Sequence, residues 1–187
     1  MTGKTNDLLF LHAIMSLKSK IASRILSSQL ASVTREKKVF NLDSATSAGI
    51  LWEIDQKESF DLIENELINA GIKTVGLCYS PLKKVVIPDD IKGFTRKQTT
   101  WSEIPKTDLA QDFIEQKFDI LIDLTGQKHL PIIYLTALSE AAFKIGYAGQ
   151  SVNYFDLNIE FSQQPETDQL AKQILYYLKR INKTTIE

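Results

Sequence analysis

The residues best suited to chemistry fall in one short segment, Asp-Leu-Thr-Gly-Gln-Lys-His, at positions 123 to 129. Asp123 could accept a ligand hydroxyl or act as a base, Lys128 could meet an anion, and His129 could exchange a proton near neutral pH. Thr125 and Gln127 complete this set of ligand-binding candidates with a hydroxyl and an amide. In the structural alternative, which we favour, Asp and Thr bond their own loop backbone and the two cationic residues are solvated.

Two further candidates, Asp55 and Ser80, follow other predicted strands. Ligands of open parallel sheets bind beyond the carboxyl ends of the strands. The loops in which a site is expected therefore begin at Asp55, Ser80, Asp123 and Tyr147. Ser80 with His129 is conceivable as a nucleophile and its base, although no motif supports that arrangement.

Missing motifs argue against several kinds of cofactor and metal site. Neither G-x-G-x-x-G nor a Walker loop occurs, and the carboxylates of Glu53, Asp55 and Glu58 after the first predicted strand would repel a phosphate. NAD and ATP binding are therefore disfavoured, and no cofactor is expected. Two histidines and one cysteine, far apart in the sequence, do not suggest a zinc site, and no G-x-S-x-G motif is present. Cys78 lies in a predicted strand, where a lone thiol packs as a small hydrophobe.

The length of 187 residues is typical of one domain, and 43% apolar residues are enough to fill one core. The longest apolar run near the N-terminus, residues 8–15, is shorter than the roughly 20 residues that a membrane-spanning helix needs. No small-x-small cleavage site follows this run, so no export signal is predicted. A single cysteine forms no disulfide within the chain. We therefore expect a cytoplasmic protein.

Short apolar runs alternate with helical patterns along the chain. The strongest run, Phe118 to Leu124, is apolar on both faces, as a central parallel strand covered by helices requires. Gly71 ends the first predicted helix, and Pro131 stands near the start of a later one. The alternation predicts an α/β fold, a Rossmann-like three-layer sandwich with a mainly parallel sheet of five or six strands. Strands are predicted at residues 48–54, 73–79, 93–96, 118–124, 143–147 and 155–161, and helices at 55–69, from 107, at 131–138 and at 167–181.

Three local details are also predicted. Asp55 and Glu58 have the spacing of a capping box at the start of the first helix. Leu109, Phe113 and Ile114 are expected on the inner side of the helix that begins near residue 107. Trp101 could stack on a base or a sugar, but a loop tryptophan folded over the core is the interpretation we favour.

The N-terminal segment differs in charge from the remainder. Residues 1–38 carry a net charge of +5, against −6 for the rest, and apolar side chains recur in this segment at helical spacing. We therefore divide the chain into a basic, amphipathic helical arm, residues 1–38, and a Rossmann-like α/β domain, residues 39–187. Residues 8–33 are expected to dock on the domain, a protein partner or a second subunit. An anionic membrane surface is the alternative, and no nucleic acid is expected because the body lacks a matching basic patch.

The segment from Phe118 to Gly126, with Tyr134 to Ser139 and Lys144 to Gly146, resembles two groups of proteins. The chain is similar over most of its length to a family of small, single-domain bacterial proteins with a basic N-terminal helix, a Gly-Ile-Leu strand, the F-D-I-L-I-D-L segment and an A-x-F-K-I-G strand. This resemblance implies a Rossmann-like fold and no assigned activity. Residues 118–146 also resemble part of the acceptor-side domain of heptosyltransferase-type glycosyltransferases, which need a second domain for their nucleotide-sugar donor.

Three functions are compatible with these features. The first is a non-enzymatic or partner-dependent binding module, because the core pattern is intact while catalytic motifs are absent. The second is a small-molecule enzyme, or a sugar or nucleotide-sugar binding remnant, that uses the loop from Asp123 to His129. The third is a peripheral membrane protein held by the arm, which predicts salt-sensitive binding to anionic vesicles.

Overall fold

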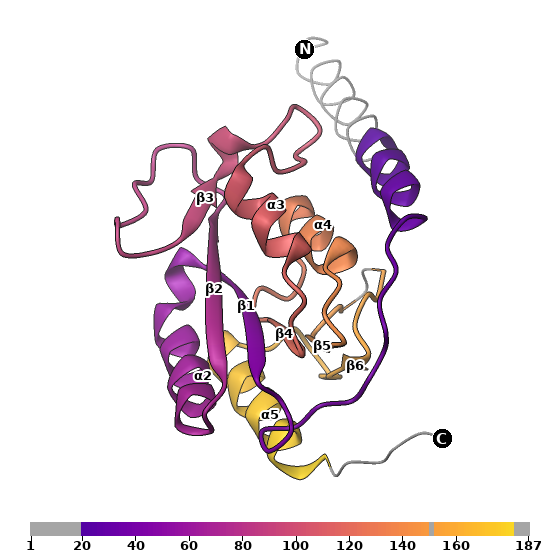
Figure 1. The fold of residues 1–187 in the computed structure, drawn as a ribbon. Helices are drawn as coiled ribbons and strands as arrows, with labels where there is room; N and C mark the ends of the chain where they lie inside the picture. Colours follow the sequence, from indigo (N-terminus) through magenta and orange to yellow (C-terminus); the bar gives the residue numbers. More distant parts are fainter. Residues whose placement is uncertain (1–19, 150–151, 182–187) are drawn as a thin grey trace.

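A parallel sheet forms the centre of the protein. The computed structural model describes residues 20–149 and 152–181, and in these ranges six strands pair in the order β3-β2-β1-β4-β5-β6 (Figure 1). Every pairing between neighbouring strands is parallel, as the alternation of strands and helices predicts. The strands are β1 (Ser47–Glu53), β2 (Lys73–Ser80), β3 (Gly93–Thr95), β4 (Ile120–Asp123), β5 (Phe143–Gly146) and β6 (Leu157–Asn158).

Helices cover both faces of the sheet and make the three-layer sandwich that the sequence predicts. The α-helices of the domain are α2 (Lys57–Asn69), α3 (Asp108–Glu115), α4 (Leu130–Leu138) and α5 (Thr167–Arg180). Helices α2 and α5 pack on one face and share a core with it, whereas α3 and α4 pack on the other (Figure 1). Two short 3-10 turns, η1 (Ile54–Gln56) and η2 (Arg96–Gln98), follow β1 and β3.

Strand β4 lies inside the sheet between β1 and β5, which confirms its predicted central place. Ile120 and Ile122 belong to the core on the side of α2 and α5, while Leu121 belongs to the core under α3 and α4. All three side chains are completely buried. Alternate side chains of a strand point to opposite faces, so a strand buried on both sides needs an unbroken apolar run. The sheet therefore places the end of β4, and the loop that follows it, at a fixed position.

The start of the first helix differs from the prediction. Asp55 and Glu58 form no capping box; Asp55 lies exposed in η1. The side chain of Gln56 instead accepts a hydrogen bond from the backbone N–H of Glu53 at 2.9 Å. The chain makes one 3-10 turn before α2 begins, which shifts the cap two residues toward the strand. Gly71 ends α2 in the left-handed conformation with φ of +80°, as predicted.

Three predicted details are wrong or only partly right. Leu109 is 37% exposed, and Ala110 lies with Phe113 on the buried side of α3, because the helix begins at Asp108 with a different rotation. Trp101 lies in a turn and is 54% exposed rather than folded over the core. The last strand is confined to Leu157–Asn158, and before it the side chain of Asn153 accepts a hydrogen bond from the backbone N–H of Phe155 at 2.8 Å, which makes a local turn there.

The segment after the arm helix is bonded to the sheet domain. Residues 20–30 are helical, whereas residues 8–19 of the predicted amphipathic stretch lie outside the described ranges. Arg35 forms a bidentate ion pair with Asp156 at 2.7 and 2.8 Å and also donates to the carbonyl of Ala141 at 3.0 Å. Such a guanidinium fork fixes orientation as well as position. The segment around Arg35 is therefore held against the loop before β6.

A buried lysine lies close to this junction. Lys144 of β5 donates through Nζ to the carbonyl oxygens of Thr136 and Ala137, at 2.7 and 3.1 Å, near the end of α4. Burial is the main cause that lowers the pKa of Lys144 from 10.5 to about 7, and the neighbouring Arg35 lowers it further. A cation at the carboxyl end of a helix meets carbonyls that lack partners within the helix. Lys144 therefore ties α4 to the sheet.

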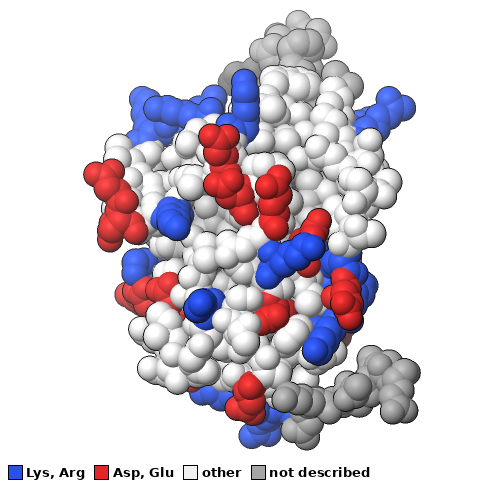
Figure 2. Space-filling model, in the orientation of Figure 1, with Lys and Arg blue, Asp and Glu red and all other residues white. Residues whose placement is uncertain are grey.

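The surface carries both signs of charge. On the face that Figure 2 shows, basic and acidic side chains are interspersed among uncharged ones and neither sign forms a continuous band. Within the described ranges, none of the helices combines the length and the apolar character needed to cross a bilayer.

Candidate functional site

Successive strands are added outward in opposite directions from β1 and β4, so the strand order reverses between these two parallel neighbours. Strand β1 continues through α2 to β2 on one face, and β4 continues through α4 to β5 on the other. The loops that leave these neighbouring strands therefore part at the carboxyl edge, which is where open α/β sheets bind their ligands. Five side chains at this edge define what we call the switch-point cluster: Glu53, Tyr79, Asp123, Gln127 and His129.

Asp123, the last residue of β4, is completely buried and bonded within the chain. Its Oδ1 accepts from the backbone N–H and the hydroxyl of Thr125, at 2.8 and 2.7 Å, and its Oδ2 accepts from the hydroxyl of Thr136 on α4 at 3.1 Å. Burial is the main cause that raises the pKa of Asp123 from 3.8 to about 6, although these hydrogen bonds oppose the rise. The carboxylate of Asp123 therefore holds the loop after β4 against α4. These contacts agree with the structural alternative, in which Asp123 and Thr125 bond within their own loop.

The turn after β4 buries a glutamine side chain without partners. Gly126 and Gln127 adopt left-handed backbone conformations with φ of 66° and 52°, and the backbone N–H of Gln127 donates to the hydroxyl of Thr125 at 3.2 Å. Gln127 is 2% exposed, and neither its Oε1 nor its Nε2 has a hydrogen-bond partner among the described residues. Burying such an amide unpaired costs about 1–3 kcal/mol, so this side chain would gain from any hydrogen-bond partner that reaches it.

Glu53 and His129 face each other across the same edge. Glu53 ends β1, and its Oε2 lies 3.5 Å from Nε2 of His129, which precedes α4. The other oxygen, Oε1, is buried and has no partner in the described part of the chain. The ring of Tyr79, at the end of β2, lies 5.6 Å from the imidazole of His129. A carboxylate beside an imidazole orients the ring.

Gln56 joins the two strand ends under this pair. Its Nε2 donates to the carbonyl of Leu124 at 3.2 Å and to the hydroxyl of Thr167 at 3.1 Å. The loop after β1 is thus bonded to the loop after β4 and to the first residue of α5. These bonds hold the two loops that carry Glu53 and Gln127 in fixed positions relative to each other.

Four of the predicted site residues lie apart from the cluster or are engaged elsewhere. Asp55 and Lys128 are exposed. Ser80 is completely buried, and its hydroxyl accepts from the backbone N–H of Leu82 at 3.3 Å. No hydrogen bond joins Ser80 to His129 in the described structure, so the arrangement gives no support to a nucleophile and base. Thr125, also predicted, is buried and serves Asp123.

Sequence reasoning missed Glu53 and Tyr79 as members of the cluster. From the sequence alone Glu53 is expected only to repel phosphate, yet it is 8% exposed and ends the strand that pairs with β4. A glutamate at the end of an otherwise apolar strand was the available signal, because such a carboxylate is brought to the carboxyl edge of the sheet. Tyr79 has a raised pKa, about 12, mainly because it is buried.

Metal and thiol chemistry find no support at the cluster. Among the described residues, no three His, Cys, Asp or Glu side chains are grouped so that they could hold a metal ion. Cys78 is completely buried in β2, and burial raises the pKa of its thiol to about 12. A thiol that stays protonated near neutral pH is a poor nucleophile.

The strand order, the three layers and the cluster at the switch point define the class: a Rossmann-like α/β protein with a candidate ligand site at the carboxyl edge of its sheet. The chain belongs to a family of unknown function (DUF6913), whose model matches residues 18–181. This confirms the predicted resemblance to an uncharacterised family that spans most of the chain. No curated protein matches the sequence significantly. The local resemblance to glycosyltransferases stays a prediction.

Proposed function

We propose that the protein is a binding module that takes a small, uncharged polar ligand at the switch-point cluster. The observation that carries the proposal is the buried amide of Gln127, which offers one acceptor and one donor group with no partner. A ligand that presents a hydroxyl or an amide satisfies both atoms at once. The unpartnered Oε1 of Glu53 supplies a second acceptor for a ligand donor.

The charges of the cluster favour a ligand without phosphate. Glu53 and Asp123 place two carboxyl groups at this edge, and the loop after β1 has no glycine turn that would bring backbone N–H groups to an anion. An anionic group would meet these carboxylates in a poorly solvated site, where repulsion is strong. Polyols, sugars without phosphate, and nucleosides carry the hydroxyl and amide groups that the cluster can bond.

A ligand screen tests this proposal. Wild-type protein is expected to unfold at a higher temperature with at least one monosaccharide, polyol or nucleoside, because a ligand at 100 times its Kd adds about 2.7 kcal/mol of stability. Gln127→Met keeps the length of the side chain but removes the amide, and we expect this variant to lose the shift. A shift that Gln127→Met retains in full, or a response to inorganic phosphate alone, would contradict the proposed site.

A second candidate function rests on the contact between Glu53 and His129. A histidine oriented by a carboxylate and partly open to solvent can transfer protons to and from a bound substrate, so a small-molecule enzyme is the alternative. In that case NMR spectra of wild-type protein with the ligand from the screen will show turnover. His129→Gln should lower the rate about 10²- to 10⁴-fold while binding persists. A ligand that stays chemically unchanged over days with wild-type protein would rule the enzyme out.

The arm and the cellular location complete the proposed function. We place the protein in the cytoplasm, with a protein partner or a second copy docking on residues 8–33. The charge asymmetry supports the arm as an attachment element, because basic residues flank its apolar stripe. Attachment of the same segment to an anionic membrane surface is the less favoured alternative. We expect no nucleic acid partner.

A further inference from the structure

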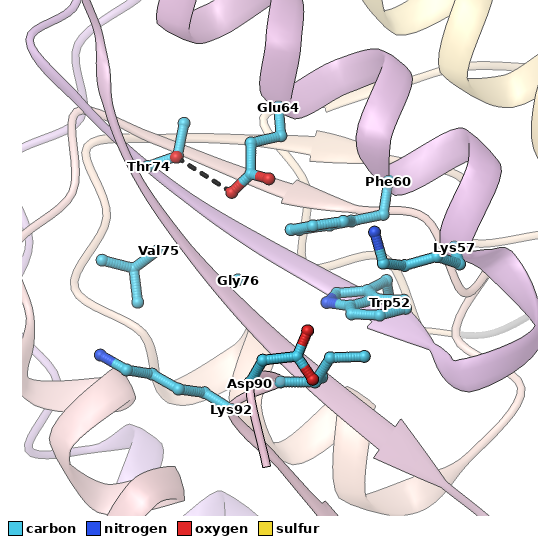
Figure 3. Close-up of a pocket in the computed structure, with 10 residues that line it drawn as sticks. Trp52, Lys57, Phe60, Glu64, Thr74, Val75, Gly76, Asp90 and Lys92 are labelled. Carbon is cyan, nitrogen blue, oxygen red and sulfur yellow. Dashed lines mark hydrogen bonds between the residues drawn. The ribbon is translucent and has the colours of Figure 1, made fainter. Parts of the chain in front are cut away.

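A pocket of about 330 Å³ opens beside β2, away from the switch-point cluster. Its walls come from α2, from β2 and from the segment that leads into β3 (Figure 3). Residues 81–92 join β2 to β3 without a helix, whereas a doubly wound sheet normally covers such a crossover with one. The missing helix leaves this part of the sheet face open beside α2. The volume is within the range of small-molecule sites.

Trp52 supplies an unused hydrogen-bond donor to this pocket. The indole is 2% exposed, and its Nε1 has no partner among the described residues. Its ring stacks on Phe60 with centroids 4.4 Å apart, which fixes its orientation. A Cβ on Gly76 would lie 2.6 Å from the Phe60 ring and 3.3 Å from Nε1, so only glycine allows both rings to approach β2 this closely. In Figure 3 the Nε1 edge of the Trp52 ring points toward Gly76, which also lines the pocket.

The charges around this donor are balanced. Two lysines, Lys57 and Lys92, and two carboxylates, Glu64 and Asp90, line the pocket. The Nζ of Lys57 lies 5.7 Å from the centre of the Phe60 ring, on the same aromatic pair as the indole donor, and also bonds Asp61. A ligand with a single charge would be attracted by either the two lysines or the two carboxylates and repelled by the other pair. A ligand with both charges can be matched at both ends.

Some of the charged groups of the pocket already have hydrogen-bond or ion-pair partners in the chain, and others do not. Glu64 accepts the hydroxyl of Thr74 through Oε1 at 3.2 Å, which leaves Oε2 for another donor. Asp90 and Lys92 are not joined in any ion pair within the described ranges. The pocket therefore keeps one carboxylate oxygen, one whole carboxylate and one ammonium for an incoming molecule.

We propose that this pocket binds a small zwitterion of the amino-acid class. Its carboxylate accepts the hydrogen bond of Trp52 Nε1 and shares the ammonium of Lys57 with Asp61, and its own ammonium group is bonded by Asp90 and Glu64. Any hydrocarbon part lies against Phe60. The inference is independent of the proposed function, because none of these residues belongs to the switch-point cluster.

The indole N–H of Trp52 reports directly on this binding. The chain has two tryptophans, so a ¹⁵N–¹H spectrum contains two indole peaks, and Trp101→Phe assigns them. Free amino acids added one at a time are expected to move the Trp52 peak downfield in a saturable manner, because its hydrogen gains an acceptor. Two analogues of each amino acid serve as controls: the amine that lacks the carboxylate and the carboxylic acid that lacks the ammonium group. At equal concentration each should move the Trp52 peak at least tenfold less than the amino acid does.

Two neighbouring aspartates provide matched variants for the same titration. Asp90→Asn should weaken binding at least tenfold, whereas Asp89→Asn, next to it on the exposed segment but outside the pocket, should leave binding unchanged. Gln127→Met should also leave it unchanged, which separates this site from the switch-point cluster. Absence of any shift with all amino acids, equal shifts with singly charged analogues, or equal effects of the two aspartate variants would overturn the proposal.

Discussion

Replacing Asp123 with alanine is expected to lower the free energy of unfolding by about 2–4 kcal/mol at neutral pH. The substitution removes the acceptor of three donors, the backbone N–H and hydroxyl of Thr125 and the hydroxyl of Thr136, in a place that water does not reach. It also leaves a small cavity between β4 and α4, which adds to the cost. Urea denaturation of wild type and Asp123→Ala, followed by circular dichroism, measures the difference.

Asp123→Asn is the matched control and should behave in the opposite way. The amide has the same shape and still accepts from Thr125, but it carries no charge into the buried site. The raised pKa of Asp123 means that the folded protein binds the proton more tightly than the unfolded chain. Wild type therefore gains stability as the pH falls through 6 toward 4, whereas Asp123→Asn does not. Relative to wild type, Asp123→Asn should be more stable at pH 7, by on the order of 2 kcal/mol, and this gain should disappear near pH 4.

A stability difference between the variant and wild type that does not change with pH would contradict this account of Asp123. It would mean that the carboxyl group has the same proton affinity in the folded and unfolded states. Equal destabilisation by Asn and Ala would show that the negative charge itself is needed, for instance to pair with a cation at this edge.

Gln127→Met should stabilise the unliganded protein by about 1–3 kcal/mol and remove ligand binding. The gain arises because methionine fills nearly the same volume without the two buried, unpartnered amide atoms. Thermal and urea unfolding without ligand measure the first effect, and calorimetric titration with the ligand measures the second. Gln127→Glu is a useful comparison, because it keeps an acceptor but buries a charge at a position that is 2% exposed and should destabilise the protein. If Gln127→Met is instead as strongly destabilised as Gln127→Glu, the amide of Gln127 has a partner in solution and the site does not exist as described.

The layers of this fold follow from the sequence because each is recorded in a local pattern. Phe118 to Leu124 is apolar on both faces, and only a strand covered by helices on both sides buries such a run. Gly71 marks the end of α2 for a backbone reason that does not depend on the rest of the protein. The rotation of a short helix is less well determined, which is why Leu109 and the cap of the first helix were assigned incorrectly.

The candidate site was only partly predictable. The loop after β4 could be found, because the carboxyl end of a central strand is a position that topology fixes. Which of its side chains turn inward depends on two left-handed residues, Gly126 and Gln127, and nothing in the sequence distinguishes the buried Gln127 from the exposed Lys128. Glu53 comes to the site only through the pairing of β1 with β4, a contact between distant segments.

A high-resolution crystal structure of the full chain, grown with the ligand that stabilises it most in the screen, tests the central claim most directly. We predict density for that ligand at the edge between β1 and β4, with polar atoms about 2.7–3.2 Å from both Oε1 and Nε2 of Gln127. Density for the ligand elsewhere, with the Gln127 amide bonded to a water molecule or to the protein itself, would contradict it.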